Sequence, residues 1–263
     1  MKLLNYPGSK GNLAGEIIGM MPPHRSYVEP FFGSGAVFFR KAKSPIETIN
    51  DLDGDVVNFF RCVREDPERM ARTVRMIPFA REEYDDAWEN PGTEDFDRAV
   101  RFLIRSKMAY GKKLSTKTGF KIDVAGRKAG YACEQWNALP EEIRVCAQRL
   151  KEAQIENRPA LDVIRRFNDP KVLMYIDPPY LMQTRTGRAY RHEMTDADHE
   201  ALLGELLKTE ARVILSGYAS QMYDDALALW HRRERRAYAQ GGAERTEVIW
   251  CNFEPEDEQM SLL

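Results

Sequence analysis

A strand and the turn after it, Val172-Leu173-Met174-Tyr175-Ile176-Asp177-Pro178-Pro179-Tyr180, set the architecture expected for this 263-residue chain. The apolar run predicts a buried strand, and Asp177 leaves it at the carboxyl end, where open α/β sheets bind ligands. The two prolines fix φ at about −65° and carry no N–H, so the neighbouring carbonyl groups face outward. An acid, a rigid carbonyl and an aromatic ring suit a planar amino group, although Asp-Pro-Pro is equally typical of a plain turn.

This strand belongs to an alternating pattern of strands and helices. Further apolar runs predict strands at 27–28, 46–49, 153–155, 213–216 and 248–251. Helical periodicity lies at 13–21, at 36–39 and after the capping box Thr195-x-x-Asp198. Strands separated by helices imply the α/β class, with a mostly parallel sheet covered on both faces.

Residues 56–150 interrupt this pattern. They read as largely helical, with a loop or hairpin expected at 111–130. A segment of this length is too long for a simple connection, so we expect a separate helical subdomain. The predicted organisation is a sheet domain built from residues 1–55 and 151–263, with the insertion at 56–150.

The composition excludes several classes of protein. Hydrophobic residues make up 43% of the chain and charged residues 30%, as in soluble globular domains. No apolar stretch resembles a membrane span or a signal peptide, so we expect a cytoplasmic protein that acts without a membrane. The cysteines form no CxxC pair, so we expect reduced thiols and no metal site. They are Cys62, Cys133, Cys146 and Cys251.

A second ligand signature lies near the start of the chain. The segment Glu29-Pro30-Phe31-Phe32-Gly33-Ser34-Gly35 follows a predicted strand, and its glycines allow a sharp turn and close approach to a ligand. Asp51 ends the next strand, 18 residues after Gly33, where an acid is placed to bind both hydroxyls of a ribose. The pair favours an adenosine-containing ligand, and the missing third glycine argues against a dinucleotide.

Charge is distributed unevenly along the chain. The net charge is −2, yet residues 101–130 hold nine basic residues and one acid, a local charge of +8. A local excess of this size favours a polyanionic partner.

Four motifs, taken in order, resemble the Dam-type family of DNA adenine-N6 methyltransferases. They are Tyr6-Pro7-Gly8-Ser9-Lys10, Tyr27 to Gly35, Ile49-Asn50-Asp51 and Asp177 to Tyr180. Segments 190–195, 215–218 and 247–250 match as well, so the resemblance spans nearly the whole chain except the centre of the insertion. It implies a Rossmann-like, S-adenosylmethionine-dependent methyltransferase sheet with an inserted, mostly helical target-recognition subdomain.

The resemblance also implies roles for individual residues. The catalytic residues would be Asp177, Pro178, Pro179 and Tyr180. The residues expected to contact S-adenosylmethionine are Tyr6, Lys10, Glu29, Pro30, Phe31, Gly33, Ser34, Gly35, Asp51 and Asp177. The cofactor adenine would face Glu156 or Asn157, a choice that the sequence leaves open.

These roles predict how an adenine amino group would be held. Asp177 would accept one N–H and the carbonyl of Pro178 the other, while Tyr180 stacks on the base. A base inside a duplex must first be flipped out. The residues expected to contact double-stranded DNA are Lys112, Lys113, Lys117, Lys121, Arg127 and Lys128. Arg185, Arg188 and Arg191 either border the target strand or form a solvated loop.

Several alternatives stay open at this point. Family members that read GATC carry a lysine where this chain has Asn5, and an Arg-Tyr-Asn run that is absent near Tyr110, so the recognition sequence is not predicted. The rival activities are N4-methylation of cytosine, methylation of adenine in RNA, and DNA binding without catalysis. We expect a monomeric protein of a bacterium or phage, working alone or with the nuclease of a restriction-modification system.

Overall fold

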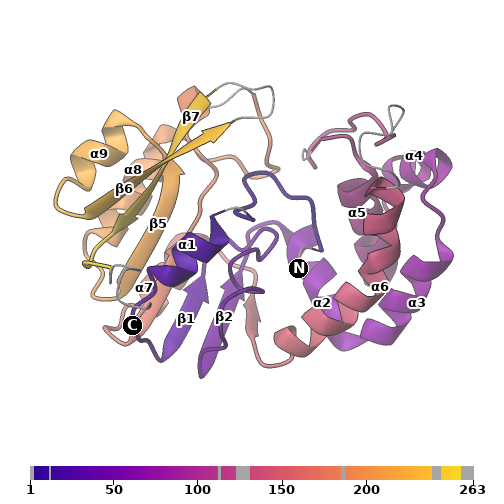
Figure 1. Ribbon diagram of the computed structural model, residues 1–263, viewed down its shortest axis with the longest axis horizontal. Coiled ribbons are helices and arrows are strands. Elements are labelled where there is room, and N and C mark those ends of the chain that lie inside the picture. The colour runs from indigo at the N-terminus through magenta and orange to yellow at the C-terminus, as the bar shows by residue number, and fades with distance from the viewer. Residues whose placement is uncertain are drawn as a thin grey trace, which may run out of the picture.

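The computed structural model describes residues 3–11, 13–111, 114–122, 131–184, 187–238 and 244–255. They form a seven-stranded sheet with the order β3-β2-β1-β4-β5-β7-β6 (Figure 1). The strands are β1 Ser26–Glu29, β2 Ile46–Asn50, β3 Gln154–Glu156, β4 Val172–Ile176, β5 Arg212–Tyr218, β6 His231–Tyr238 and β7 Glu244–Cys251. The first five in this order pair in parallel, and β7 is antiparallel to β5 and β6. The predicted α/β class and mainly parallel sheet are confirmed.

The strand β4 lies at the centre of the sheet, and all five of its residues are therefore buried. Val28 of β1 pairs with Met174 on one side, and Leu215 of β5 pairs with Ile176 on the other. Parallel strands end at the same edge of a sheet, so the loops after β1, β2 and β4 lie close together there. This register brings the two ligand signatures of the sequence to one place.

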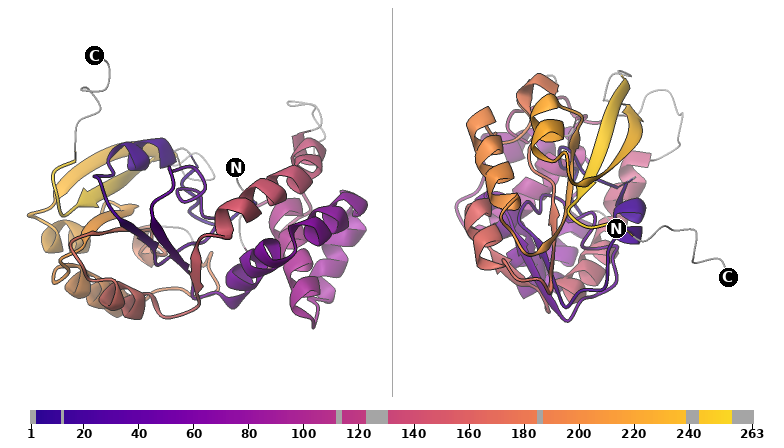
Figure 2. Two further views of the ribbon diagram at one scale, coloured as in Figure 1. Left: turned by 90° about the horizontal axis from the view of Figure 1, so that it is seen from below. Right: turned by 90° about the vertical axis from the view of Figure 1, so that its left-hand side faces the viewer.

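Helices cover both faces of the sheet, and alternate residues of β4 point to each. Leu173 and Tyr175 belong to a hydrophobic cluster that contains Ile17 of α1 (Ala14–Gly19). Met174 packs in a second cluster with α7 (Ala160–Arg166) and α8 (Asp196–Leu206) on the opposite face (Figure 2). The short helix α9 (Gln221–Ala226) follows β5. The predicted capping box at the start of α8 is confirmed, since the Thr195 and Asp198 side chains each accept the other's backbone N–H.

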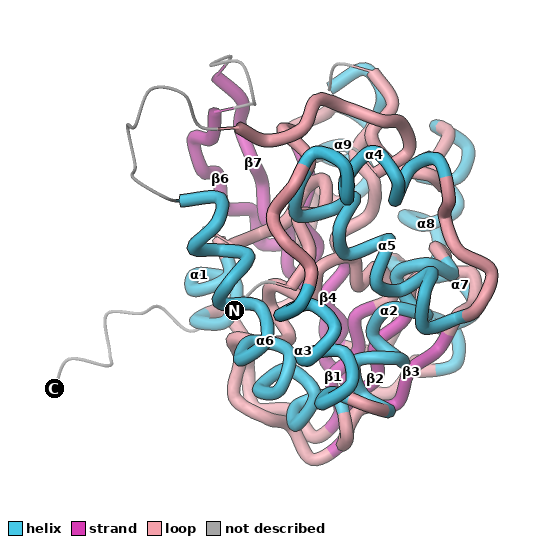
Figure 3. Tube along the Cα trace, turned by 90° about the vertical axis from the view of Figure 1, so that its right-hand side faces the viewer, coloured by secondary structure: helices cyan, strands magenta, loops and turns pink. Residues whose placement is uncertain are grey.

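Residues 54–150 contain a group of helices beside the sheet (Figure 3). They are α2 Gly54–Glu65, α3 Pro67–Met76, α4 Arg81–Glu89, α5 Asp95–Met108 and α6 Tyr131–Leu150. Their core is continuous with one face of the sheet, since Phe60 of α2 meets Phe32 edge to face at 4.9 Å between ring centroids. The division of the chain into domains stays a prediction. After α5, Ala109 and Phe120 form the bridge of a hairpin, so the hairpin begins just before the predicted range of 111–130.

One sequence prediction about local structure was wrong, and one strand was missed. Residues 36–39 form turns rather than a helix, because the Arg40 N–H bonds to the carbonyl of Val37 and interrupts the run of helical hydrogen bonds. Phe38 and Phe39 pack against the ring of Phe32 there. The strand β6 was not predicted, because its sequence His231-Arg-Arg-Glu-Arg-Arg is charged. It pairs along β7 at the edge of the sheet, where Arg235 forms an ion pair with Glu16 of α1 at 2.7 Å.

Candidate active site

A cavity of about 270 Å³ opens at the carboxyl ends of β1, β2 and β4. Of the residues predicted from the sequence, nine line it: Tyr6, Lys10, Glu29, Phe31, Gly33, Ser34, Asp51, Asp177 and Pro179. Six other predicted catalytic or cofactor-binding residues do not: Pro30, Gly35, Glu156, Asn157, Pro178 and Tyr180. The two signatures that lie far apart in the sequence therefore share one site.

The turn after β1 needs glycine at two positions. Gly33 has a φ of 50° and Gly35 a φ of 62°, both in the left-handed region. A Cβ on Gly33 would come within 2.8 Å of the Tyr6 ring, and one on Gly35 within 2.4 Å of the Phe32 ring. The chain therefore passes directly beneath Tyr6, which forms part of the cavity wall.

Asp51 is held by the backbone at the end of β2. Its Oδ2 accepts the Gly33 N–H at 2.7 Å, and its Oδ1 accepts the Asp53 N–H at 2.9 Å. Burial raises the pKa of Asp51 to about 7, against the opposing effect of these two donors. The side chain is therefore fixed in place and sensitive to any further donor that enters the cavity.

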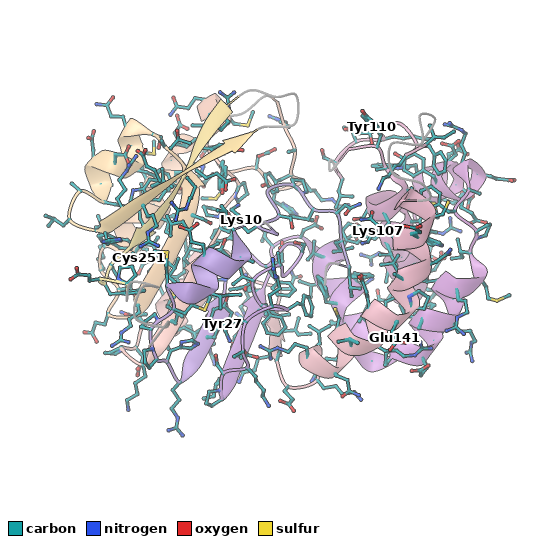
Figure 4. All side chains as sticks on the ribbon, in the orientation of Figure 1. Lys10, Tyr27, Lys107, Tyr110, Glu141 and Cys251 are labelled. Carbon is teal, nitrogen blue, oxygen red and sulfur yellow. The ribbon has the colours of Figure 1, made fainter. Side chains whose placement is uncertain are left out.

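Asp177 carries the densest set of polar contacts in the site. The ammonium of Lys10, a residue that lies just before α1 (Figure 4), is 2.8 Å from its Oδ1 and 2.9 Å from its Oδ2. The hydroxyl of Ser216, on β5, donates to Oδ1 at 2.9 Å. Lys10 also donates to the carbonyl of Gly8 at 2.8 Å and lies 4.6 Å from the centroid of the Tyr180 ring.

The Tyr180 ring is buried in this structure. It is 7% exposed, with Lys10 near the ring and Tyr218 edge-on at a centroid distance of 4.5 Å. The sequence prediction did not include Tyr218 among the site residues; it is the last residue of β5. A base can stack on Tyr180 only after the ring has been uncovered.

Glu29 is a second buried acid in the cavity. It is 2% exposed, and its Oε1 accepts the hydroxyl of Tyr27 at 2.5 Å. Burial raises the pKa of Glu29 to about 8, although the Tyr27 hydrogen bond lowers it. The negative charge of Asp177 adds to the rise. Glu29 therefore holds a proton at neutral pH.

The segment after the Asp-Pro-Pro-Tyr turn forms part of the cavity wall, which the sequence prediction missed. Its lining residues are Tyr190, His192, Glu193 and Met194. Arg191 anchors the segment, since its guanidinium pairs with Asp53 at 3.1 Å and with Asp55 at 2.7 Å. Arg188 is exposed and Arg185 lies outside the described residues, so of these arginines only Arg191 has a described role.

Part of the cavity wall is apolar. It consists of Leu52 and the run Pro159-Ala160-Leu161. Asn157 lies outside the cavity and donates its amide N–H to the carbonyl of Asp51 at 2.7 Å, while Glu156 pairs with Arg158 at 3.3 Å. Neither Glu156 nor Asn157, the two candidates for facing the cofactor adenine, lines this wall.

The candidate DNA-binding residues are only partly described. Lys117 pairs with Asp85 at 2.8 Å, and Lys121 donates to Gln135 at 3.2 Å. Lys112, Lys113, Arg127 and Lys128 lie outside the described residues. Within the described ranges no cluster of His, Cys, Asp and Glu suits a metal ion, and no helix there is long and apolar enough to cross a membrane.

Comparison with known proteins agrees with this geometry. The model of the D12 class N6 adenine-specific DNA methyltransferases matches residues 6–234. The chain is 26% identical to the DNA adenine methylase of Serratia marcescens over 93% of this chain and 94% of that protein. It is 24% identical to the DNA adenine methylase of Escherichia coli strain K12, over 93% and 91% of the two chains. It is also 22% identical to the type II methyltransferase M1.LlaDCHI of Lactococcus lactis subsp. cremoris, over 94% of each chain.

The resemblance inferred from the four motifs is thereby confirmed, because the matched region contains all of them. The cavity at the carboxyl ends of the parallel strands, with Asp177 beside it, is the candidate active site of an enzyme: this chain belongs to the D12 class of N6 adenine-specific DNA methyltransferases.

Proposed function

We propose that the enzyme transfers a methyl group from S-adenosylmethionine to the N6 amino group of an adenine flipped out of double-stranded DNA at a specific sequence. The observation that carries the proposal is the convergence of Asp177, Asp51 and the Gly33 turn on one cavity. Each comes from a different strand end, so the arrangement depends on the whole sheet.

The cavity suits S-adenosylmethionine along its length. Asp51 would accept the ribose hydroxyls, and the apolar wall from Pro159 to Leu161 would cover the flat adenine. Tyr6 and Phe31 offer aromatic faces to a sulfonium cation, worth about 0.5–2 kcal/mol in comparable contacts. Lys10 and Glu29 lie in the same cavity for the amino-acid part. When bound, the cofactor supplies an electrophilic methyl group.

Asp177 and Pro178 would hold the target amino group. The lone pair of an exocyclic amine is delocalised into the ring, so the amine is a poor nucleophile. Asp177 accepting one N–H and the Pro178 carbonyl accepting the other would orient the amine, and such positioning is worth about 7–11 kcal/mol in favourable systems. An ionised carboxylate has about four lone-pair sites, so the contacts with Lys10 and Ser216 leave room for this donor.

The hairpin after α5 would position the DNA. It lies at the same end of the molecule as the carboxyl ends of the strands (Figure 1). The basic residues of 112–128 would neutralise phosphates around the target, and flipping the base would cost about a few kcal/mol. Entry of the base would also have to uncover Tyr180 for stacking.

The proposal extends to the cellular setting. The enzyme would act as a monomer in the cytoplasm of a bacterium, without a metal ion, either alone or beside a partner nuclease. Size-exclusion chromatography with light scattering tests the monomer, and activity in the presence of a strong chelator tests the independence from metal.

One assay tests the central reaction. The protein is incubated with methyl-labelled S-adenosylmethionine and unmethylated duplex DNA or RNA, and the nucleosides are then separated. Label in N6-methyladenine from DNA is expected. Label in N4-methylcytosine, label only in RNA, or no label above the Asp177→Ala control would contradict the proposal.

A further inference from the structure

A short chain of hydrogen bonds links Asp177 to Ser216 and Ser216 to Tyr175. Ser216, on β5, is 1% exposed and its hydroxyl is 2.9 Å from Asp177 Oδ1. The hydroxyl of Tyr175, on β4, is 3.0 Å from Ser216 Oγ and 3% of Tyr175 is exposed. The adjacent pairing of Ile176 with Leu215 brings these side chains together across the two strands.

The chemistry of the groups fixes the direction of the chain. An ionised carboxylate only accepts hydrogen bonds, so the single proton of Ser216 must point to Asp177. Tyr175 must then donate to Ser216. Burial, followed by the charge of Asp177, raises the pKa of Tyr175, so its hydroxyl keeps the proton that this requires.

Ser216 has a competing acceptor. The carbonyl of Ile176 is 3.4 Å from its hydroxyl, further than Asp177 Oδ1. A donated proton from Tyr175 occupies one lone pair of Ser216 and favours the orientation toward the carboxylate. Without Tyr175, the Ser216 proton can turn between the two acceptors.

Ser216 is suited to fix the carboxylate in a way that Lys10 is not. Lys10 contacts both oxygens at nearly equal distances, so it does not distinguish one oxygen from the other. Ser216 has a short side chain on a buried strand and contacts Oδ1 alone. A hydrogen bond to Oδ1 alone would restrain the carboxylate and leave Oδ2 to face an incoming amine.

We propose that Ser216 and Tyr175 are positioning residues for methyl transfer: Tyr175 orients the hydroxyl of Ser216, and Ser216 fixes the Asp177 carboxylate that receives the target amino group. This inference rests on the proposed function, because it assigns Asp177 the role described there. It predicts a defect in the chemical step rather than in binding.

The test is a double-mutant cycle with Ser216→Ala, Tyr175→Phe and the combination. Ser216→Ala should lower kcat about ten- to a hundredfold, as small displacements of reacting groups do. Tyr175→Phe should lower it about threefold, a smaller effect because Ser216 still reaches Asp177. The double variant should match Ser216→Ala, since Tyr175 acts only through Ser216. The Kd for S-adenosylmethionine and the KM for DNA should stay within about twofold of wild type.

Two further variants separate positioning from simple loss of packing. Ser216→Thr keeps the hydroxyl and should recover most of kcat. Ser44→Ala removes another buried serine hydroxyl, at the amino end of β2 beside Lys41 and Glu47, and should leave kcat unchanged per folded molecule. Far-ultraviolet circular dichroism and thermal unfolding determine the folded fraction of each variant.

The outcomes distinguish this inference from the proposed function. A wild-type enzyme that methylates neither DNA nor RNA overturns the proposed function itself. If the wild type is active and Ser216→Ala is equally active, only the inference is overturned. The same holds if the losses in kcat of the two single variants multiply in the double variant, or if the defect is confined to cofactor binding. If Ser216→Ala fails to fold, Tyr175→Phe decides the matter. A wild-type kcat in Tyr175→Phe overturns the inference, and a threefold lower kcat with unchanged binding supports it.

Discussion

The two ends of the sheet each contain a lysine–carboxylate pair with a buried lysine, but in different surroundings. At the amino end, Lys41 lies 2.7 Å from Glu47, and Ser44 and Arg149 bind the same carboxylate. None of these four residues lines the cavity. At the carboxyl end, Lys10 and Asp177 form an equally short pair, yet both residues border the cavity, among acids with raised pKa values.

This difference predicts a structural role for the Lys41–Glu47 pair and a catalytic role for the Lys10–Asp177 pair. Around Glu47 the protein itself supplies the partners, which are the cations Lys41 and Arg149 and the backbone N–H of Ser44, so the cluster ties α6 to β2. Around Asp177 the protein leaves space, and the neighbouring acids Glu29 and Asp51 are destabilised in their charged forms. Removing a charge should therefore affect stability at the amino end and catalysis at the carboxyl end.

The largest effect is expected for Asp177→Asn. The amide keeps the shape of the side chain but places an N–H₂ donor where an acceptor is needed. The value of kcat should fall about ten-thousandfold, equivalent to about 5 kcal/mol in the barrier. Single-turnover methylation measures this, and Kd for S-adenosylmethionine checks that the cavity is intact. A loss below about tenfold would remove Asp177 from the reaction.

Glu47→Gln should show the opposite behaviour. The residue is 1% exposed, and its loss leaves Lys41 and Arg149 buried without their carboxylate. The free energy of unfolding should fall by about 3–5 kcal/mol in urea titrations, while kcat per folded molecule stays at the wild-type value. The matched control is Glu152→Gln, because the Glu152–Lys43 pair is more than half exposed and should contribute less than about 1 kcal/mol. Equal losses in the two variants would contradict the comparison.

The raised pKa of Glu29 predicts how stability depends on pH. A carboxyl whose pKa rises from 4.5 to about 8 on folding makes the folded state bind more protons than the unfolded state between these values. Its contribution is present below about pH 4.5 and is lost as pH rises through 8, a change of roughly 2–4 kcal/mol. Glu29→Gln should flatten this part of the profile. Urea unfolding at pH steps from 5 to 9 measures it, and parallel curves for variant and wild type would count against a buried neutral acid.

The smallest effect is expected at the segment that closes the cavity. Arg191→Ala removes the ion pairs between the partly exposed Arg191 and the carboxylates of Asp53 and Asp55, so Kd for S-adenosylmethionine should rise about three- to tenfold. Isothermal titration calorimetry measures this change. Arg188→Ala, in an exposed arginine of the same segment, should leave Kd unaltered. Equal Kd values for the two variants would show that the anchor does not matter.

Much of the architecture could be read from local patterns. An apolar run ending at Asp177, the Gly33 turn and the acid at Asp51 mark strand ends, and strand ends in a parallel sheet share one edge. The capping box at Thr195 could be predicted equally well, because its two residues, Thr195 and Asp198, are only three positions apart in the sequence. The turn at residues 36–39 could not be predicted in this way, because its four apolar residues fit a helix and a buried turn equally well.

Sequence motifs thus identified the chemistry: which acids end which strands, and the family that combines them. They did not reveal the partners, because Lys10 lies 167 residues from Asp177 and Ser216 lies 39 residues beyond it. Such contacts depend on strand order and register, which bring distant residues within hydrogen-bonding distance. The burial of Tyr180, the anchoring of Arg191 and the chain from Tyr175 through Ser216 are likewise consequences of folding, since each needs two or more elements packed together.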